Sequence, residues 1–276
     1  RFVLVTCFRL DAAEGMTMKN IDDENMSDRI SEVLEAAAHN LEMRKSSSQS
    51  IARMHEEGGA LAPIQLEQRR MIHREESVRQ QSDAFREIRT RLLAMGGHQN
   101  FVTLVVAVSP RSGSSFVTRN LATAFAFDEA KTSLLIDCNV RYPNQHKVMG
   151  VEPSRGGLID LMDHPAIGIE SIIYHTGVPH LRLIPAGKSR ESSSEYFTSH
   201  RMRAVIDSLR SRYSDRYIFL DGPSIKGAPD ARILADLADF VVVVAGYGKD
   251  TPGAINQALS HFEPSKLAGV VFNQAP

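Results

Sequence analysis

The sequence predicts an α/β fold, a doubly wound and mainly parallel sheet with helices on both faces and a helical extension at the N-terminus. Uncharged runs of apolar and β-branched residues alternate with segments of helical periodicity, as βαβ units require. Two of these runs end in an aspartate, at the sheet edge where such folds place their ligands. We expect core strands at 101–108, 133–137, 181–185, 217–221, 240–245 and 268–273.

Length and composition fit one large α/β domain with an appendage. The 276 residues are 42% hydrophobic and 24% charged, both ordinary for a globular protein, and the net charge is −1. No global field therefore favours nucleic acid, and no nucleic-acid partner is expected. No run of about 18 apolar residues occurs, so no membrane span is expected. The two cysteines, Cys7 and Cys138, are far apart, which argues against a disulfide framework.

The first 80 residues are expected to form an N-terminal extension, and residues 81–276 the main domain. Ser27 is a good N-cap for an amphipathic helix at 27–45, and the apolar-poor segment that follows is typical of a linker. A second helix is predicted from Ser82 to about Met95. Its charged flank would ordinarily be a solvated face. The charges of interest on that flank are Asp83, Arg86 and Arg89.

The strand at 101–108 leads into a loop of small residues and then a helix that begins near Phe116. Strand, small-residue loop and helix form a P-loop, whose backbone N–H groups and helix N-terminus favour a phosphate. Gly113 and Ser115 fit the motif G-x-x-x-x-G-K-[ST], but Ser114 stands at the position of the lysine. A tight turn without a ligand is the alternative. The predicted phosphate-binding residues are Arg111, Ser112, Gly113, Ser114, Ser115 and Phe116.

Two expected strands end in aspartates, Asp137 and Asp221, and both follow the P-loop-like turn. A single aspartate at the end of a strand is usually a helix cap or a loop residue. Two on central strands of one sheet favour a phosphate–metal site, because such carboxylates hold Mg²⁺ beside the loop hydroxyl in P-loop NTPases. We therefore predict Asp137 and Asp221 as catalytic residues, and Ser115 with both aspartates as metal ligands.

From residue 83 to residue 273 the chain resembles the cytoplasmic domain of bacterial tyrosine kinases (BY-kinases) of capsule and exopolysaccharide synthesis, relatives of the MinD/ParA-like ATPases. The motifs that carry the resemblance are DAFREIRTRLL at 83–93, SPRSGSSFVTRNLA at 109–122, LLIDCNVRYP at 134–143, RYIFLDGP at 216–223 and GVVFN at 269–273. They correspond to the helix before the P-loop, Walker A, Walker A′, Walker B and the last strand.

The resemblance implies ATP or ADP with Mg²⁺ as cofactors. It also implies self-association through Asp83, Arg86 and Arg89, or pairing with a membrane polysaccharide chain-length regulator. The protein would then be cytoplasmic and recruited to the inner face of the membrane.

The sequence departs from the family at parts that handle phosphate charge. Ser114 replaces the lysine, Arg111 a glycine and Asn139 the second Walker A′ aspartate, and the last tyrosine of the printed chain is Tyr247. Arg111, Arg119 or Arg141 would have to supply the missing charge. Three hypotheses follow: a degenerate regulatory subunit of a polysaccharide polymerisation and export system, an active tyrosine autokinase, and a MinD/ParA-like positioning ATPase. We favour the first.

Overall fold

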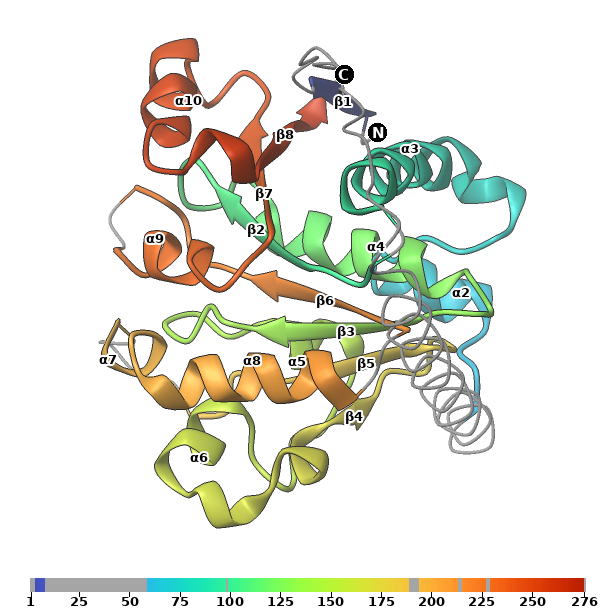
Figure 1. Ribbon diagram of the computed structural model, residues 1–276. Helices are drawn as coiled ribbons and strands as arrows, with labels where there is room; N and C mark the ends of the chain where they lie inside the picture. The colour runs from blue at the N-terminus through green and yellow to red at the C-terminus, as the bar shows by residue number, and fades with distance from the viewer. Residues whose placement is uncertain are drawn as a thin grey trace, which may run out of the picture.

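The computed structural model describes residues 3–7, 59–97, 99–188, 194–212, 215–226 and 229–275. The helix expected at 27–45 lies outside these ranges. Within them, the chain forms one sheet with helices on both faces (Figure 1).

Eight strands of the described chain form the sheet, in the order β1-β8-β7-β2-β6-β3-β5-β4. The six inner strands run parallel, and the edge strands β1 and β4 are antiparallel to their neighbours. The bounds are β1 Val3–Cys7, β2 Val102–Ala107, β3 Thr132–Asp137, β4 Tyr174–His175, β5 Leu181–Ile184, β6 Arg216–Asp221, β7 Phe240–Gly246 and β8 Leu267–Ala275. The six predicted strands and the fold class are thus confirmed, whereas neither edge strand was predicted.

Helices cover both faces of the sheet. Helices α3 and α4 pack on one face, and α8, α9 and α10 lie on the other (Figure 1). The predicted helices near 82–95 and from 116 correspond to α3 and α4. The helix bounds are α2 Pro63–Gln68, α3 Arg79–Gly96, α4 Ser114–Ala126, α5 Gln145–Met149, α6 Leu158–Asp163, α7 Ser194–Phe197, α8 His200–Arg212, α9 Asp230–Ala235 and α10 Pro252–Leu259. Short 3-10 turns occupy Glu76–Val78, Pro165–Ile167, Ile169–Ile172 and Pro264–Lys266.

Residues 59–80, which the sequence predicted to be linker, pack against the main domain. Met71 and Ile72 are buried in the same apolar cluster as the inner faces of α3 and α4. Asn120 of α4 fixes the segment, because its side chain accepts a hydrogen bond from the Ile72 N–H at 2.7 Å and donates one to the Arg70 carbonyl at 3.0 Å. The domain boundary at residue 80 stays a prediction. No helix in the described part of the chain is long and apolar enough to cross a membrane.

The strand order places the predicted site residues together. The carboxyl ends of β2, β6 and β3 are neighbours in the sheet, and they lead respectively to the P-loop, Asp221 and Asp137. Because parallel strands end at the same edge, all three converge there without any contribution from the helices.

Candidate phosphate-binding site

The loop from β2 to α4 joins a buried strand to the N-terminus of a helix, which is the arrangement of a P-loop. Gly113, the N-cap of α4, has a φ of 94°, and a Cβ on it would lie 2.0 Å from Asn273 Nδ2. Asn273 in turn donates a hydrogen bond to the Ser112 carbonyl at 3.0 Å. Glycine is therefore required at 113 by both conformation and space. Arg111, where the family has glycine, also takes a left-handed φ of 66°, which is unfavourable for a residue with a side chain.

Asp250, in the loop between β7 and α10, braces the P-loop from the neighbouring strand. Its carboxylate accepts hydrogen bonds from Ser109 Oγ at 2.5 Å, Ser112 Oγ at 2.7 Å and the Gly246 N–H at 2.7 Å. Lys249 Nζ donates to the Pro110 carbonyl. Sequence reasoning missed Asp250. The available signal was a polar residue after a predicted strand of the same sheet, which does not reveal its partners about 140 positions away.

Asp137 and Asp221 lie directly opposite each other as register partners on β3 and β6, and both are almost fully buried. Asp137 accepts hydrogen bonds from the backbone N–H groups of Asn139, Asn144 and Gln145, each at 3.1 Å. The structure therefore brings the two predicted aspartates together, whereas their catalytic role stays a prediction.

Burial raises the pKa of both carboxyl groups above their ordinary value. For Asp137, the neighbouring charge of Asp221 raises the pKa further, and the three backbone hydrogen bonds lower it. For Asp221, hydrogen bonds from Gln145 and Ser115 and the positive charge of Arg119 partly oppose the effect of burial on the pKa. Burial also lowers the pKa of Arg119 to about 10, so its guanidinium group remains charged at neutral pH.

Gln145, the first residue of α5, lies between Asp221 and the P-loop. Its side-chain Nε2 donates to Asp221 Oδ2 at 2.6 Å and to the Ser115 carbonyl at 2.9 Å. Its Oε1 accepts a hydrogen bond from Arg119 Nη1 at 3.1 Å, and Thr118 Oγ1 donates to Asp221 Oδ1 at 3.3 Å. Sequence reasoning considered Arg119 as a cation but missed Gln145, which stands two positions after the Walker A′ motif.

The arrangement does not fit a Mg²⁺ ion between Asp221 and the P-loop. Carboxylate and hydroxyl oxygens are suitable ligands for this cation, but the Gln145 amide group occupies the position that faces Asp221 Oδ2. In the described part of the chain, no three His, Cys, Asp or Glu side chains gather closely enough to hold a metal. The assignment of Ser115, Asp137 and Asp221 as metal ligands stays a prediction, and Gln145 argues against it.

A cleft of about 1630 Å³ opens at this edge of the sheet, in front of the buried carboxylates. Of the predicted phosphate-binding residues, five line it, whereas Ser112 is fully buried and does not. Among the described residues, seven basic side chains line the cleft with a single acidic one, Asp230, so the charge of the lining favours an anion. The basic residues are Arg69, Arg70, Arg111, Arg119, Arg141, Lys147 and Lys226; the predicted residues that line it are Arg111, Gly113, Ser114, Ser115 and Phe116.

The predicted interface residues lie on α3, away from the cleft lining. Asp83 and Arg86 are half-exposed and form an ion pair with each other at 2.9 Å. Arg89 is more buried and reaches the Asp128 carboxylate at 3.1 Å, beyond the C-terminal end of α4. Asp83 and Arg86 are therefore accessible to a partner, whereas Arg89 also anchors α3 to α4 within the chain.

Fold and site together define a P-loop α/β domain with a basic cleft at the carboxyl ends of its parallel strands. No family model matches the chain. It is 32% identical over 194 residues to the tyrosine-protein kinase wzc of Salmonella typhimurium (strain LT2), a match that covers 69% of this chain and 26% of that protein. It is 28% identical over 186 residues to the succinoglycan biosynthesis transport protein ExoP of Rhizobium meliloti (strain 1021), with 65% of this chain and 23% of that protein covered. The chain thus spans about a quarter of the length of these curated relatives.

The solved structures agree on the fold. The chimerical protein CapA2B2 matches with a TM-score of 0.65 at 24% identity, over 75% of this chain and 93% of that one. The kinase domain of the Escherichia coli tyrosine kinase ETK matches with a TM-score of 0.65 at 21% identity, over 78% and 86% of the two chains. The domain is homologous to the P-loop domains of bacterial tyrosine-protein kinases, and the family resemblance predicted from the motifs is confirmed.

Proposed function

We propose that this chain is a catalytically degenerate P-loop protein of the BY-kinase type, which regulates a system for capsular or exopolysaccharide polymerisation and export. The similarity to a succinoglycan biosynthesis transport protein supports the polysaccharide context. The observation that carries the proposal is Ser114. It is the first residue of α4, it lines the cleft, and it stands where the P-loop lysine belongs.

Phosphoryl transfer relies on positioning and on stabilising the charge that develops on the transferred group. A serine hydroxyl supplies no positive charge there. The lysine that contacts the loop, Lys249, donates to the Pro110 carbonyl and is not part of the cleft lining. The loop N–H groups, the N-terminus of α4 and the cleft arginines remain, and these suffice to hold the phosphates of ATP or ADP without turnover.

An active autokinase is the second candidate, and the basic lining of the cleft is the observation that favours it. Arg111, Arg119 and Arg141 all line the cleft and carry fixed positive charge. An arginine in place of the lysine would grip phosphate oxygens in a different geometry, so this candidate requires one of the three to stabilise the transition state.

Turnover of labelled ATP and anti-phosphotyrosine blotting of the purified full chain separate the two candidates. We expect turnover at the level of a no-protein control, both for the unmodified chain and for Ser114→Ala. Ser114→Lys reports whether the missing lysine alone limits the reaction. Robust ATP turnover by the unmodified chain that is lost in Asp137→Ala would refute the proposal of a catalytically degenerate protein and would support an active autokinase.

We further propose that the protein acts in the cytoplasm, at the inner face of the membrane. It would be held there by self-association or by a membrane polysaccharide chain-length regulator, through the α3 surface of Asp83, Arg86 and Arg89. Exposed charge pairs fix orientation but contribute little energy, so the assembly should be sensitive to single substitutions.

Sedimentation velocity of the full chain tests the self-association. Arg86→Ala should shift it towards smaller species. Asp128→Ala is the matched control, because it removes the intrachain partner of Arg89 and leaves the α3 charges in place. A chain that sediments as a monomer before and after the Arg86 change would contradict self-association through this surface.

A further inference from the structure

The buried carboxylates at the sheet edge already have a cationic partner from within the chain. Arg119 lies one helical turn after Ser115 on α4 and is only 4% exposed. Its Nη1 reaches the Gln145 Oε1 at 3.1 Å, and Gln145 Nε2 reaches Asp221 at 2.6 Å. A continuous hydrogen-bonded path therefore connects a fixed positive charge to the Walker B carboxylate through one buried amide group.

The same path passes through the P-loop. The Ser115 carbonyl accepts hydrogen bonds from Gln145 Nε2 at 2.9 Å and from Arg119 Nη1 at 3.5 Å. A divalent ion at this point would have to displace the Gln145 amide and would then lie beside the guanidinium group. Two like charges in a buried, poorly solvated position repel each other strongly, so the arginine and a metal ion exclude one another.

Arg119 also has donor capacity left for a ligand. Its Nε is buried and has no hydrogen-bond partner, and the side chain lines the cleft at the N-terminal end of α4. A buried donor without a partner is costly, and a phosphate oxygen would satisfy it with a charge-assisted hydrogen bond. Arg119 therefore contacts Gln145 through Nη1, and a residue of the cleft lining keeps one buried N–H group without a partner.

We infer that Arg119 and Gln145 take the place of the divalent cation in this chain, so that a nucleoside di- or triphosphate binds at the P-loop without Mg²⁺. The ligand class rests on the proposed function, whereas the exclusion of the metal does not. Arg119 supplies the positive charge next to the phosphates, and Gln145 positions it and blocks Asp221 from metal coordination.

Two titrations of the full chain test this inference. Isothermal titration calorimetry with ADP is run in EDTA and in MgCl₂, and free Mn²⁺ is titrated without nucleotide and followed by its electron paramagnetic resonance signal. For the unmodified chain we expect ADP affinities that agree within about twofold in the two buffers, and no loss of the free Mn²⁺ signal. Arg119→Ala should weaken ADP binding in EDTA about tenfold or more, as expected for a lost charge-assisted hydrogen bond.

Two variants and a control complete the test. The double variant Arg119→Ala with Gln145→Ala should gain Mn²⁺ binding, because it removes the resident charge and uncovers Asp221. Gln145→Ala alone should keep metal-independent ADP binding and serves if the double variant does not fold. Arg210→Ala, an arginine in an ion pair with Asp239 at the opposite sheet edge, should match the unmodified chain in both titrations.

Mg²⁺ that tightens ADP binding about tenfold in the unmodified chain, with the gain lost in Asp221→Asn, would overturn the inference. Mn²⁺ binding by the unmodified chain would do the same. Absence of ADP binding in both buffers would refute the ligand and hence the inference as stated. ATP turnover by the unmodified chain is the separate failure of the proposed function.

Discussion

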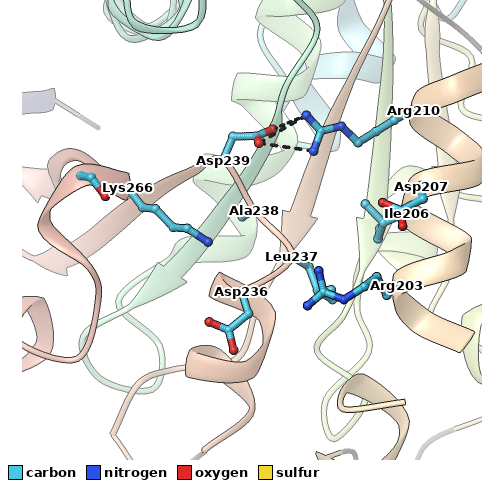
Figure 2. A pocket seen from close by; sticks show the side chains of 10 residues that line it. Arg203, Ile206, Asp207, Arg210, Asp236, Leu237, Ala238, Asp239 and Lys266 are labelled. Atoms are coloured by element: carbon cyan, nitrogen blue, oxygen red, sulfur yellow. Dashed lines mark hydrogen bonds and ion pairs between the residues drawn. The ribbon is translucent and has the colours of Figure 1, made fainter. Parts of the chain in front are cut away.

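Two cavities lie at opposite ends of the parallel strands, and the charges of the residues that line them differ. The cleft at the carboxyl ends of the strands is lined by seven basic residues and one acidic residue. The smaller cavity, about 320 Å³ near the beginnings of β7 and β8, is lined by three of each (Figure 2). Its charged residues are Arg203, Asp207, Arg210, Asp236, Asp239 and Lys266.

The small cavity satisfies much of its charge internally. Figure 2 shows Arg210 directed at Asp239, and their ion pair measures 3.0 Å. Asp239 also accepts a hydrogen bond from the Val102 N–H at 2.8 Å, and Lys266 Nζ donates to the Ala235 carbonyl at 2.9 Å. Volume and charged residues alone therefore do not mark a ligand site. An excess of one sign, as in the cleft, is the stronger indication of a ligand site, because an oppositely charged ligand would balance it.

The largest effect on stability is expected from Asp250, whose carboxylate anchors the P-loop beside the cleft. Asp250→Ala leaves two serine hydroxyls and the Gly246 N–H without their acceptor, and it should lower the free energy of unfolding by about 2–3 kcal/mol. Urea unfolding at pH 7 measures this. Asp236→Ala, an exposed carboxylate in the small cavity, is the control and should change the free energy by less than about 0.5 kcal/mol. Equal losses of unfolding free energy in the two variants would contradict the role of Asp250 in anchoring the P-loop.

The pKa of Asp250 adds a pH dependence. Burial raises this pKa, but the hydrogen bonds from Ser109, Gly246 and Ser112 outweigh it and leave the pKa lowered. Its contribution is therefore present at neutral pH and is lost as the pH falls through its folded pKa. The difference between the unmodified chain and Asp250→Ala should shrink on acidification.

The second effect concerns Asp137 and Asp221, whose contribution to stability depends on pH in the opposite direction to that of Asp250. Because the pKa values of Asp137 and Asp221 are raised, the folded protein holds protons that the unfolded chain releases. Their contribution is full below the ordinary value of 3.8 and is lost as the pH rises through the folded pKa values. We expect the unmodified chain to lose about 1–2 kcal/mol relative to Asp221→Asn between pH 5 and pH 8, measured by urea unfolding. If the unfolding free energies of the two proteins changed in parallel with pH, the raised pKa values of the carboxyl pair would be contradicted.

The smallest effect is expected at the balanced cavity. Arg210 and Asp239 are 37% and 35% exposed in their side chains, so solvent screens their ion pair. Arg210→Ala should cost about 0.5–1 kcal/mol in thermal or urea unfolding. A loss above about 2 kcal/mol would mean that this cavity is as dependent on its charges as the cleft is.

Sequence periodicity predicted the inner sheet because the pattern is local. An uncharged run such as VTLVVA buries both faces of a strand wherever it stands. Runs dominated by apolar residues predicted all six parallel strands, although the β5 run LRLI contains Arg182. The edge strands escaped prediction for the opposite reason. β4 has only two residues, too few for a pattern, and β1 pairs with β8 from the other end of the chain.

The sequence by itself also determined the main parts of the candidate site. Gly113 and Ser115 in a small-residue loop, and aspartates at the ends of two strands, are local signals, and parallel strands bring them to one edge by geometry. The serine in place of the P-loop lysine is likewise visible in the sequence. What these signals cannot provide is which groups compensate the buried carboxylates.

Only the tertiary structure decided which groups contact the buried carboxylates and the P-loop. Gln145 meets Asp221 across 76 positions, and Asp250 meets Ser109 across 141. Three arginines were equal candidates for the missing charge in the sequence, and packing placed Arg119 beside Gln145 and the Asp221 carboxylate. Hydrogen bonds act over about 3 Å and depend on direction, so which groups form them is set by how helices and loops pack on the sheet, and residue type alone does not determine this.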